Sequence, residues 1–367
     1  MNEVRLPLAG RAGLATPVEP DEMATEIAGG PEAVEATLIA LHDNHAGLVG
    51  EVSAARDVVL VGTGASLAMV RCAAPLWRAH DLSTGARRQL TVLEGSELAF
   101  GSYAGGLDRD ALIVVAVSKS GSGPEIRSAV DLAKSAGRRV VVVTAVEHSA
   151  LAAAAEHTVV TPIGEEQGAA TKSALGALAA LLALGGVLDT EPQSVARLRS
   201  LLTRARADEQ AAYALGTSVG DARRVWVVGF GSGYGVADAL GLLLHEKAQL
   251  AAISTTPSAF RHGLVEASAR GDAVVAVACD AASPVVESYL DRLGYECGLL
   301  GIRTGWITAA GRDGEWVPLQ GDTPAAQTLE AVLRAQQVAH IAAHRAGTYV
   351  DGFKVLRTFV SPGEAFA

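Results

Sequence analysis

The sequence is poor in cysteine, aromatic residues and long apolar runs, and each shortage argues against a class of protein. Its three cysteines, Cys72, Cys279 and Cys297, form no CxxC or Cys/His spacing. Such a set argues against a disulfide framework and a zinc cluster, and it fits a reducing cytoplasm. We therefore expect a cytoplasmic protein without a metal site or a cofactor.

Apolar segments that could enter a membrane are also missing. The longest apolar stretch, Leu175–Leu188, contains three glycines, and the N-terminus has no apolar core of a signal peptide. No run of Lys or Arg stands out, and the formal net charge is −10. This argues against a nucleic-acid surface, although a local nest of backbone amides can still bind a phosphorylated metabolite. We expect no membrane and no nucleic acid among the partners.

Glycine and aliphatic side chains are abundant, with 40 glycines, 49% hydrophobic residues and 4% aromatic residues. Continuous apolar segments alternate with helical patterns, which predicts an α/β fold with parallel strands covered on both faces. The predicted strands are Val58–Val61, Leu90–Leu93, Leu112–Val117, Val140–Thr144, His157–Val160, Val225–Val228, Ala273–Ala278 and Cys297–Arg303.

The plan of an apolar strand followed by a glycine turn occurs twice. Val225–Gly233 repeats the pattern of Val58–Ser66, and a chain of 367 residues favours two domains. We predict an N-terminal arm (1–22), a first α/β domain (23–190), a second α/β domain (191–346) and a C-terminal tail (347–367).

A hydroxyl-rich turn is the sharpest candidate for ligand binding. Ser118, Lys119, Ser120 and Gly123 lie between an apolar strand and a helix that begins at Pro124. Hydroxyls and free N–H groups at such a position can wrap a phosphate. An ordinary serine-rich helix cap is the alternative. We predict that this turn binds a phosphate group.

The first glycine turn is a second candidate. Gly64 and Ser66 follow a strand and open a helix, where backbone N–H groups can approach a ligand, although glycine can also serve a tight turn alone. Leu67 occupies the place of the third glycine in a dinucleotide fingerprint, as Tyr234 does after the second turn. A nicotinamide dehydrogenase is therefore disfavoured.

Two ionisable residues in the second half are candidates for catalysis. Glu246 follows the apolar run Leu242–Leu244, and a carboxylate beside an apolar wall can have a raised pKa and act as a general base. A solvated glutamate on a polar helix face is the alternative. His262 is equally ambiguous, since a lone histidine is often structural.

In their order along the chain, these segments resemble the double sugar isomerase (SIS) domain family, and in particular the isomerase half of glucosamine-6-phosphate synthase. The chain opens without an N-terminal cysteine nucleophile, so we expect no glutaminase domain. The turn at Ser118 is similar to the family's Ser-Gln-Ser-Gly-Glu-Thr phosphate loop. The other matching segments are Met23–Pro31, Ser96–Leu98, Glu165–Lys172 and the pair Glu246 and His262, sixteen residues apart.

The resemblance implies two SIS domains, each a five-stranded parallel sheet sandwiched between helices in a flavodoxin-like αβα arrangement. It also implies a homodimer with shared active sites and a sugar phosphate as substrate. Glu246 would move a proton between C1 and C2, and His262 would assist ring opening from the neighbouring chain. Lys354, in the tail, would also enter the site.

Several polar residues of the family pattern are replaced. Gly123 stands for threonine, Lys119 for glutamine, Ala239 for a glutamate and Leu243 for a lysine. This implies an altered substrate. We predict an aldose–ketose isomerase of phosphosugars or aminosugar phosphates, extending to deamination or amination at C2. The alternatives are a deglycase of phosphorylated amino-sugar conjugates and a non-catalytic phosphosugar sensor.

Overall fold

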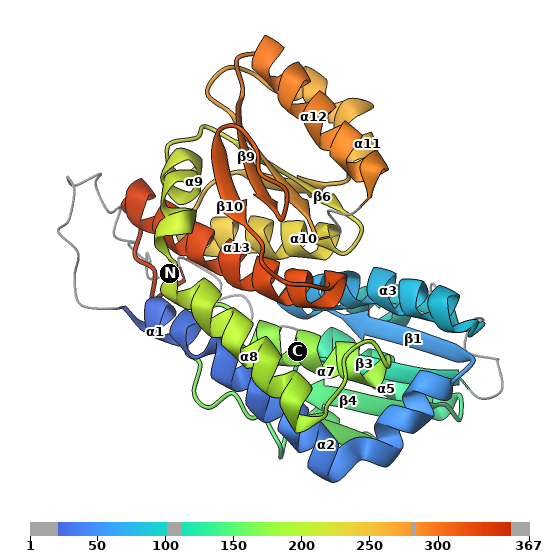
Figure 1. Cartoon of the computed structure of the whole chain (residues 1–367). Coiled ribbons are helices and arrows are strands. Elements are labelled where there is room, and N and C mark those ends of the chain that lie inside the picture. The colour runs from blue at the N-terminus through green and yellow to red at the C-terminus, as the bar shows by residue number, and fades with distance from the viewer. Residues whose placement is uncertain (1–20, 101–111, 280–282, 354–367) are drawn as a thin grey trace.

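The chain forms two five-stranded sheets whose paired strands are all parallel (Figure 1). The computed structural model describes residues 21–100, 112–279 and 283–353. The first sheet has the order β2-β1-β3-β4-β5 and the second the order β10-β9-β8-β6-β7. The strands are β1 Asp57–Gly62, β2 Gln89–Glu94, β3 Leu112–Val117, β4 Arg139–Thr144, β5 His157–Val160, β6 Val225–Phe230, β7 Ala252–Thr255, β8 Ala273–Ala278, β9 Arg303–Thr308 and β10 Glu315–Pro318.

Helices connect the strands and cover the sheets. Their bounds are α1 Glu22–Ala28, α2 Gly30–Ala54, α3 Gly64–Thr84, α4 Gly95–Ala99, α5 Pro124–Ser135, α6 Ala150–Ala154, α7 Lys172–Leu184, α8 Pro192–Ala207, α9 Gln210–Gly220, α10 Gly233–Leu243, the π-helical turn η2 Leu244–Ala248, α11 Pro257–Arg261, the 3₁₀ turn η3 Leu264–Ala267, α12 Pro284–Leu299 and α13 Pro324–Ala346. Where the structure describes the chain, no helix combines the length and apolarity that a membrane span needs.

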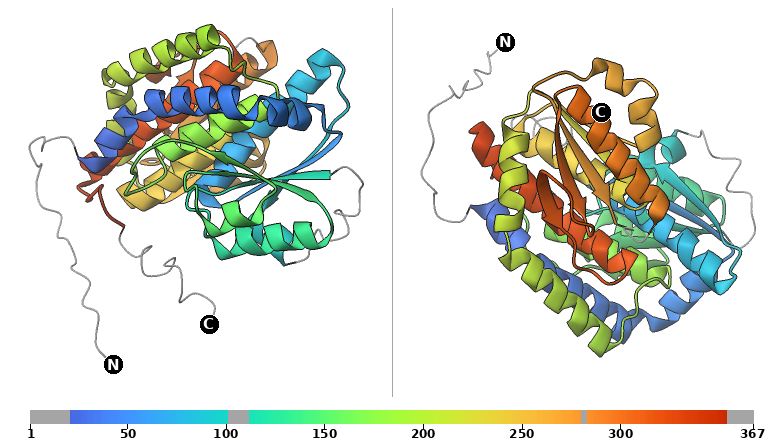
Figure 2. Two further views of the ribbon diagram at one scale, coloured as in Figure 1. Left: turned by 90° about the horizontal axis from the view of Figure 1, so that it is seen from below. Right: turned by 45° about the horizontal axis from the view of Figure 1, so that its top comes forward.

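The predicted fold class is confirmed, because apolar strands lie between helices on both faces. In the first sheet, Val59 and Val114 pack with Ile126 of α5, whereas the alternate residue Leu60 lies in the same core cluster as Leu178 of α7. Figure 2 shows these helices on opposite sides of that sheet. Since both faces are covered, the strands need no polar alternation.

In the second half, one predicted strand was wrong and two strands were not predicted. The predicted strand Cys297–Arg303 is the end of α12 and a turn, and β9 begins only at Arg303. Gly301, with φ of +64°, separates the two elements. The four-residue strands β7 and β10 were not predicted, and both lie at the edges of their sheet.

The two halves share one hydrophobic core. Leu60 and Leu178 of the first half belong to the same buried cluster as Val275 and Val338 of the second half. A Cβ on Gly235 would lie 2.3 Å from the backbone N of Cys72, so this glycine lets α10 approach α3 closely. The domain limits at 22, 190 and 346 stay predictions.

Candidate active site

The two glycine- and serine-containing turns of the first half lie side by side. Strands β1 and β3 are neighbours, with Gly62 paired to Val117 at their carboxyl ends. The turn that contains Gly64 and Ser66 and the turn Ser118–Gly123 therefore share one edge of the sheet, which is where open α/β sheets bind ligands.

The turn Ser118–Gly123 leaves donors available at the start of α5. Gly123 is the N-cap and makes no side-chain capping bond. Gly121 has φ of +61°, and a Cβ there would lie 2.1 Å from Ser149 Oγ, so only glycine fits. The Ser122 hydroxyl donates to Ser120 Oγ over 2.9 Å, and Ser120 itself is exposed. These features suit an anion at this turn.

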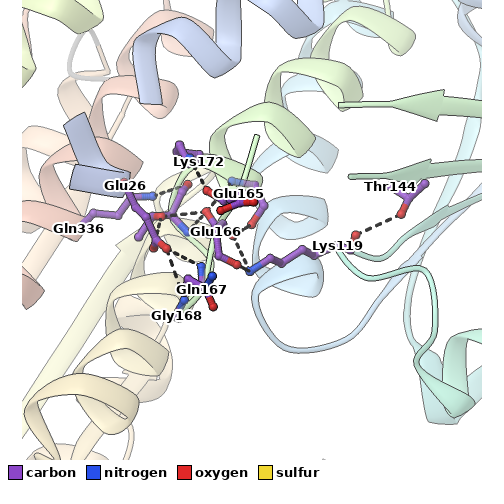
Figure 3. Close-up of polar contacts among 11 residues, drawn as sticks. Glu26, Lys119, Thr144, Glu165, Glu166, Gln167, Gly168, Lys172 and Gln336 are labelled. Atoms are coloured by element: carbon purple, nitrogen blue, oxygen red, sulfur yellow. Dashed lines mark hydrogen bonds and ion pairs between the residues drawn. The ribbon is translucent and has the colours of Figure 1, made fainter. Parts of the chain in front are cut away.

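Lys119 points from the same turn to a glutamate. Its Nζ lies 2.7 Å from Glu166 Oε2 and donates to the Glu166 carbonyl over 3.2 Å (Figure 3). Burial tends to raise the pKa of Glu166, but the charge and hydrogen bond of Lys119, with a bond from Ser173, hold it below its usual range. Lys119 therefore joins the phosphate turn to the loop before α7.

The loop before α7 is held from three directions. Glu166 Oε1 accepts a bond from the Thr171 N–H over 3.0 Å. Glu26 of α1 accepts bonds from the N–H of Gln167 at 2.6 Å and from Thr171 Oγ1 at 3.2 Å. Gln336 of α13 donates to the Thr171 carbonyl over 3.0 Å (Figure 3). The family resemblance in the sequence included Glu165–Lys172 and the segment with Glu26, but it did not include Gln336.

Glu246 lies in the π-helical turn η2, which continues α10. π-helical turns inside helices occur often at functional sites. Burial raises the pKa of Glu246 to about 7, against the opposing charges of Lys247 and Lys119. Among the described residues, no hydrogen bond reaches its carboxylate, so this side chain can exchange a proton near neutral pH.

The cavity beside Glu246 brings the two halves together. Its lining residues are Ala65, Ala170, Ala174, Ala239, Leu242, Leu243, Glu246, Val332 and Gln336. Ala65 lies in the first turn of α3, between Gly64 and Ser66, and Ala170 belongs to the loop before α7. Glu246 of the second half thus lies beside the first turn of α3, at a cavity of about 10 Å³, which is room for one water.

Comparison with known proteins agrees with this arrangement. Residues 93–185 match the model of the SIS domain family. No curated protein sequence matches the chain.

Solved structures share the fold across nearly the whole chain. Tagatose-6-phosphate ketose/aldose isomerase from Escherichia coli superposes with a TM-score of 0.77 at 21% identity, covering 95% of this chain and 100% of that chain. The C-terminal domain of glucosamine-fructose-6-phosphate aminotransferase from Francisella tularensis gives a TM-score of 0.70 at 18% identity, covering 90% and 97%. Glucosamine-6-phosphate deaminase from Thermotoga maritima gives a TM-score of 0.66 at 17% identity, covering 88% of this chain and 94% of that chain. The chain therefore has the fold of phosphosugar isomerases with SIS domains.

Of the two remaining catalytic candidates, His262 and Lys354, the structure describes only His262. His262 is exposed at the end of α11 and does not line the cavity of its own chain. Lys354 lies outside the described residues.

Lys247, next to Glu246, contacts the last residues that the structure describes. Its Nζ lies 4.1 Å from the centroid of the Phe353 ring. Lys247 is fully buried and also donates to the Gly352 carbonyl over 3.2 Å. Lys247 was not among the predicted site residues, although a lysine next to Glu246 in an apolar segment could have indicated a buried cation.

Proposed function

We propose that this protein is an aldose–ketose isomerase of phosphosugars or aminosugar phosphates. The observation that carries the proposal is the place of Glu246: it lines a small cavity together with Ala65 of the first turn of α3, and that turn shares one sheet edge with the turn Ser118–Gly123. One edge of the first sheet offers hydroxyls and helix N-terminal amides for a phosphate, and the second half supplies a carboxylate. A phosphorylated sugar needs both groups at once.

Glu246 acts as the base in the proposed reaction. Its carboxylate removes the proton from C2 of the open-chain aldose, the C–H electron pair forms the C1–C2 double bond, and O1 takes up a proton. The resulting enediol collapses to the ketose when C1 receives a proton from Glu246 and O2 loses its own. A pKa of about 7 suits this role, since both protonation states are accessible near neutral pH.

The remaining substrate contacts come from the turns and from a second chain. Ser118, Lys119, Ser120 and Gly123 bind the phosphate. Gly64 and Ser66 contact the sugar from the first turn of α3. Because His262 is exposed and outside the cavity of its own chain, we place it in the site of the neighbouring chain of a homodimer, where it assists ring opening. Lys354 enters the site from the tail.

The test is exchange at C2. A panel of sugar phosphates and aminosugar phosphates deuterated at C2 is incubated with the wild-type protein and with Glu246→Gln, and loss of label is followed by mass spectrometry. Glu246→Gln should reduce exchange by about 10²–10⁴-fold while binding is kept, because it preserves shape but removes basicity. The exposed Glu266 gives the matched control, Glu266→Gln. Exchange that survives in Glu246→Gln removes Glu246 from the mechanism.

A phosphosugar sensor without catalysis is the second candidate, and the wall of the cavity favours it. Ala239 and Leu243 line the space around Glu246 with apolar atoms, where the SIS resemblance implied a glutamate and a lysine. Thermal shifts with sugar phosphates, combined with no exchange by wild-type protein on any of them, would assign the chain to this class.

A further inference from the structure

Two histidines and a carboxylate converge where the start of α1 meets the end of α13. Asp21 Oδ2 lies 2.8 Å from His340 Nε2 and 2.6 Å from His344 Nε2. The two Nε2 atoms are 3.1 Å apart. His340 and His344 are four residues apart on α13, so they share one face of the helix. Three atoms that can ligate a metal ion thus surround one point.

A second carboxylate lies near the other ring nitrogen of His340. Glu209, before α9, places Oε1 at 3.7 Å from His340 Nδ1. A proton on Nδ1 facing Glu209 leaves a lone pair on Nε2 in a neutral imidazole. That lone pair faces a carboxylate of Asp21, which when ionised only accepts. Two acceptors this close repel each other unless a cation or an additional proton lies between them.

We propose that Asp21, His340 and His344 bind one divalent first-row transition metal ion, best matched by Zn²⁺. Zinc takes histidine nitrogen and carboxylate oxygen at about 2.0–2.2 Å, which places tetrahedral ligands roughly 3.3 Å apart. The three candidate ligand atoms are 2.6–3.1 Å apart, slightly less than this separation. Glu209 is the outer carboxylate that metal-ligating histidines commonly contact. His344 is exposed, so a water can complete the coordination.

The bound ion would fasten α1 to α13. Asp21 directly precedes α1, whose Glu26 holds the loop before α7. The metal therefore acts as a structural clamp near the candidate active site. This inference does not depend on the proposed function, because its readouts are binding and thermal stability.

The experiment uses the full chain without a histidine tag, stripped with a chelator and exchanged into chelator-free buffer. Titration calorimetry with Zn²⁺ should give one ion per chain. Co²⁺ should produce the visible absorption of a tetrahedral site. Saturating Zn²⁺ should raise the melting temperature by several degrees, and chelator should reverse the shift.

Three variants separate a metal site from fortuitous contacts. His344→Ala removes an exposed ligand and should weaken Zn²⁺ binding by at least 100-fold. Glu209→Gln keeps the three ligands and should weaken it by about 10–100-fold. His148→Ala, an exposed histidine outside the cluster, should bind as wild type does. Circular dichroism checks that each variant is folded.

Absence of Zn²⁺ and Co²⁺ binding by folded wild-type protein would overturn the proposal and leave a proton between His340 and Asp21. Wild-type affinity in His344→Ala would also overturn it, because the ion would then bind elsewhere.

Discussion

The two halves repeat one topology but differ after equivalent strands. In strand order, β2, β1, β3, β4 and β5 correspond to β7, β6, β8, β9 and β10. Strand β3 leads into Ser118–Gly123 and a helix that begins at Pro124. Strand β8 leads through Cys279–Ser283 to a helix that begins at Pro284. In sequence, the second connection holds an aspartate and one serine where the first holds a lysine and three serines.

The glycine turns after the central strands differ as well. In the second half, the Ser232 hydroxyl pairs with Thr328 of α13 at 2.8 Å, and both residues are buried. In the first half, Ala65 stands at the place of Ser232 and has no hydroxyl, whereas the glycines before them are alike: Gly64 and Gly231 are both exposed, with φ of +52° and +54°. The two turns therefore differ in this side-chain contact and not in the conformation of their glycines. In the function proposed above the roles are divided: the first half binds phosphate and the second supplies the base.

The largest expected effect tests the base of the second half through pH. Since Glu246 must be ionised to accept a proton and its pKa is raised to about 7, exchange at saturating substrate should rise with pH and level off above pH 7. Between that plateau and pH 5 the rate should fall roughly 100-fold, tenfold for each pH unit below the pKa.

The variant Lys119→Met tests whether a charge in the first half affects the pH profile set by Glu246 in the second half. Because Lys119 lowers the pKa of Glu246, its removal should shift the midpoint to higher pH. A profile that is flat between pH 5 and pH 7 would rule out Glu246 as the rate-controlling base.

The next effect tests the difference between the two turns. Ser120→Ala should weaken binding of sugar phosphates by about 10- to 150-fold, the loss of a hydrogen bond to a charged group. Ser283→Ala changes the one serine of the connection between β8 and α12 and should leave binding unchanged. Titration calorimetry measures both affinities. Equal losses in the two variants would contradict a division of roles.

A third effect tests whether active sites are shared between two chains. Glu246→Gln and His262→Ala should each be inactive. After subunit exchange of an equal mixture, half of the dimers are hybrids with one intact site, so about a quarter of the wild-type activity should return. Native mass spectrometry confirms the exchange. A mixed sample that stays inactive despite hybrid dimers would rule out sharing.

The sequence was sufficient for the fold because periodicity and glycine turns are local signals. Apolar strands such as Ala273–Ala278 match β8 residue for residue. The short strands β7 and β10 carry few apolar residues and depend on the sheet that they join. Cys297 and Leu299 belong to the end of α12, where an apolar segment was misread as a strand.

Side-chain partners were harder to predict than elements. Lys119 was predicted as a phosphate ligand, which stays a prediction, but its pairing with Glu166 depends on a loop 47 residues later in the chain. Metal binding was judged from cysteine spacing alone. The pair His340 and His344 had the right helical spacing, yet Asp21 lies 319 residues away from His340. Contacts at such separations arise only from tertiary structure.

The smallest expected effect concerns the support of the first turn. The Glu166 side chain has no exposed surface and accepts bonds from Lys119, Thr171 and Ser173. Glu166→Gln should therefore lower the free energy of unfolding at pH 7 by about 1.5–3 kcal/mol, the range for hydrogen bonds to a charged group.

This stabilisation should depend on pH. Since the folded pKa of Glu166 lies below its ordinary value of 4.5, the stabilisation is present above pH 4.5 and disappears as pH falls through the folded pKa. Urea denaturation at pH 7 and at pH 3.5 measures this, and the difference between wild type and variant should shrink at the lower pH. Glu156→Gln breaks an exposed pair with Arg139 and should cost about 0–1 kcal/mol. Equal losses in both variants would show that the Lys119–Glu166 pair contributes no more than a surface contact.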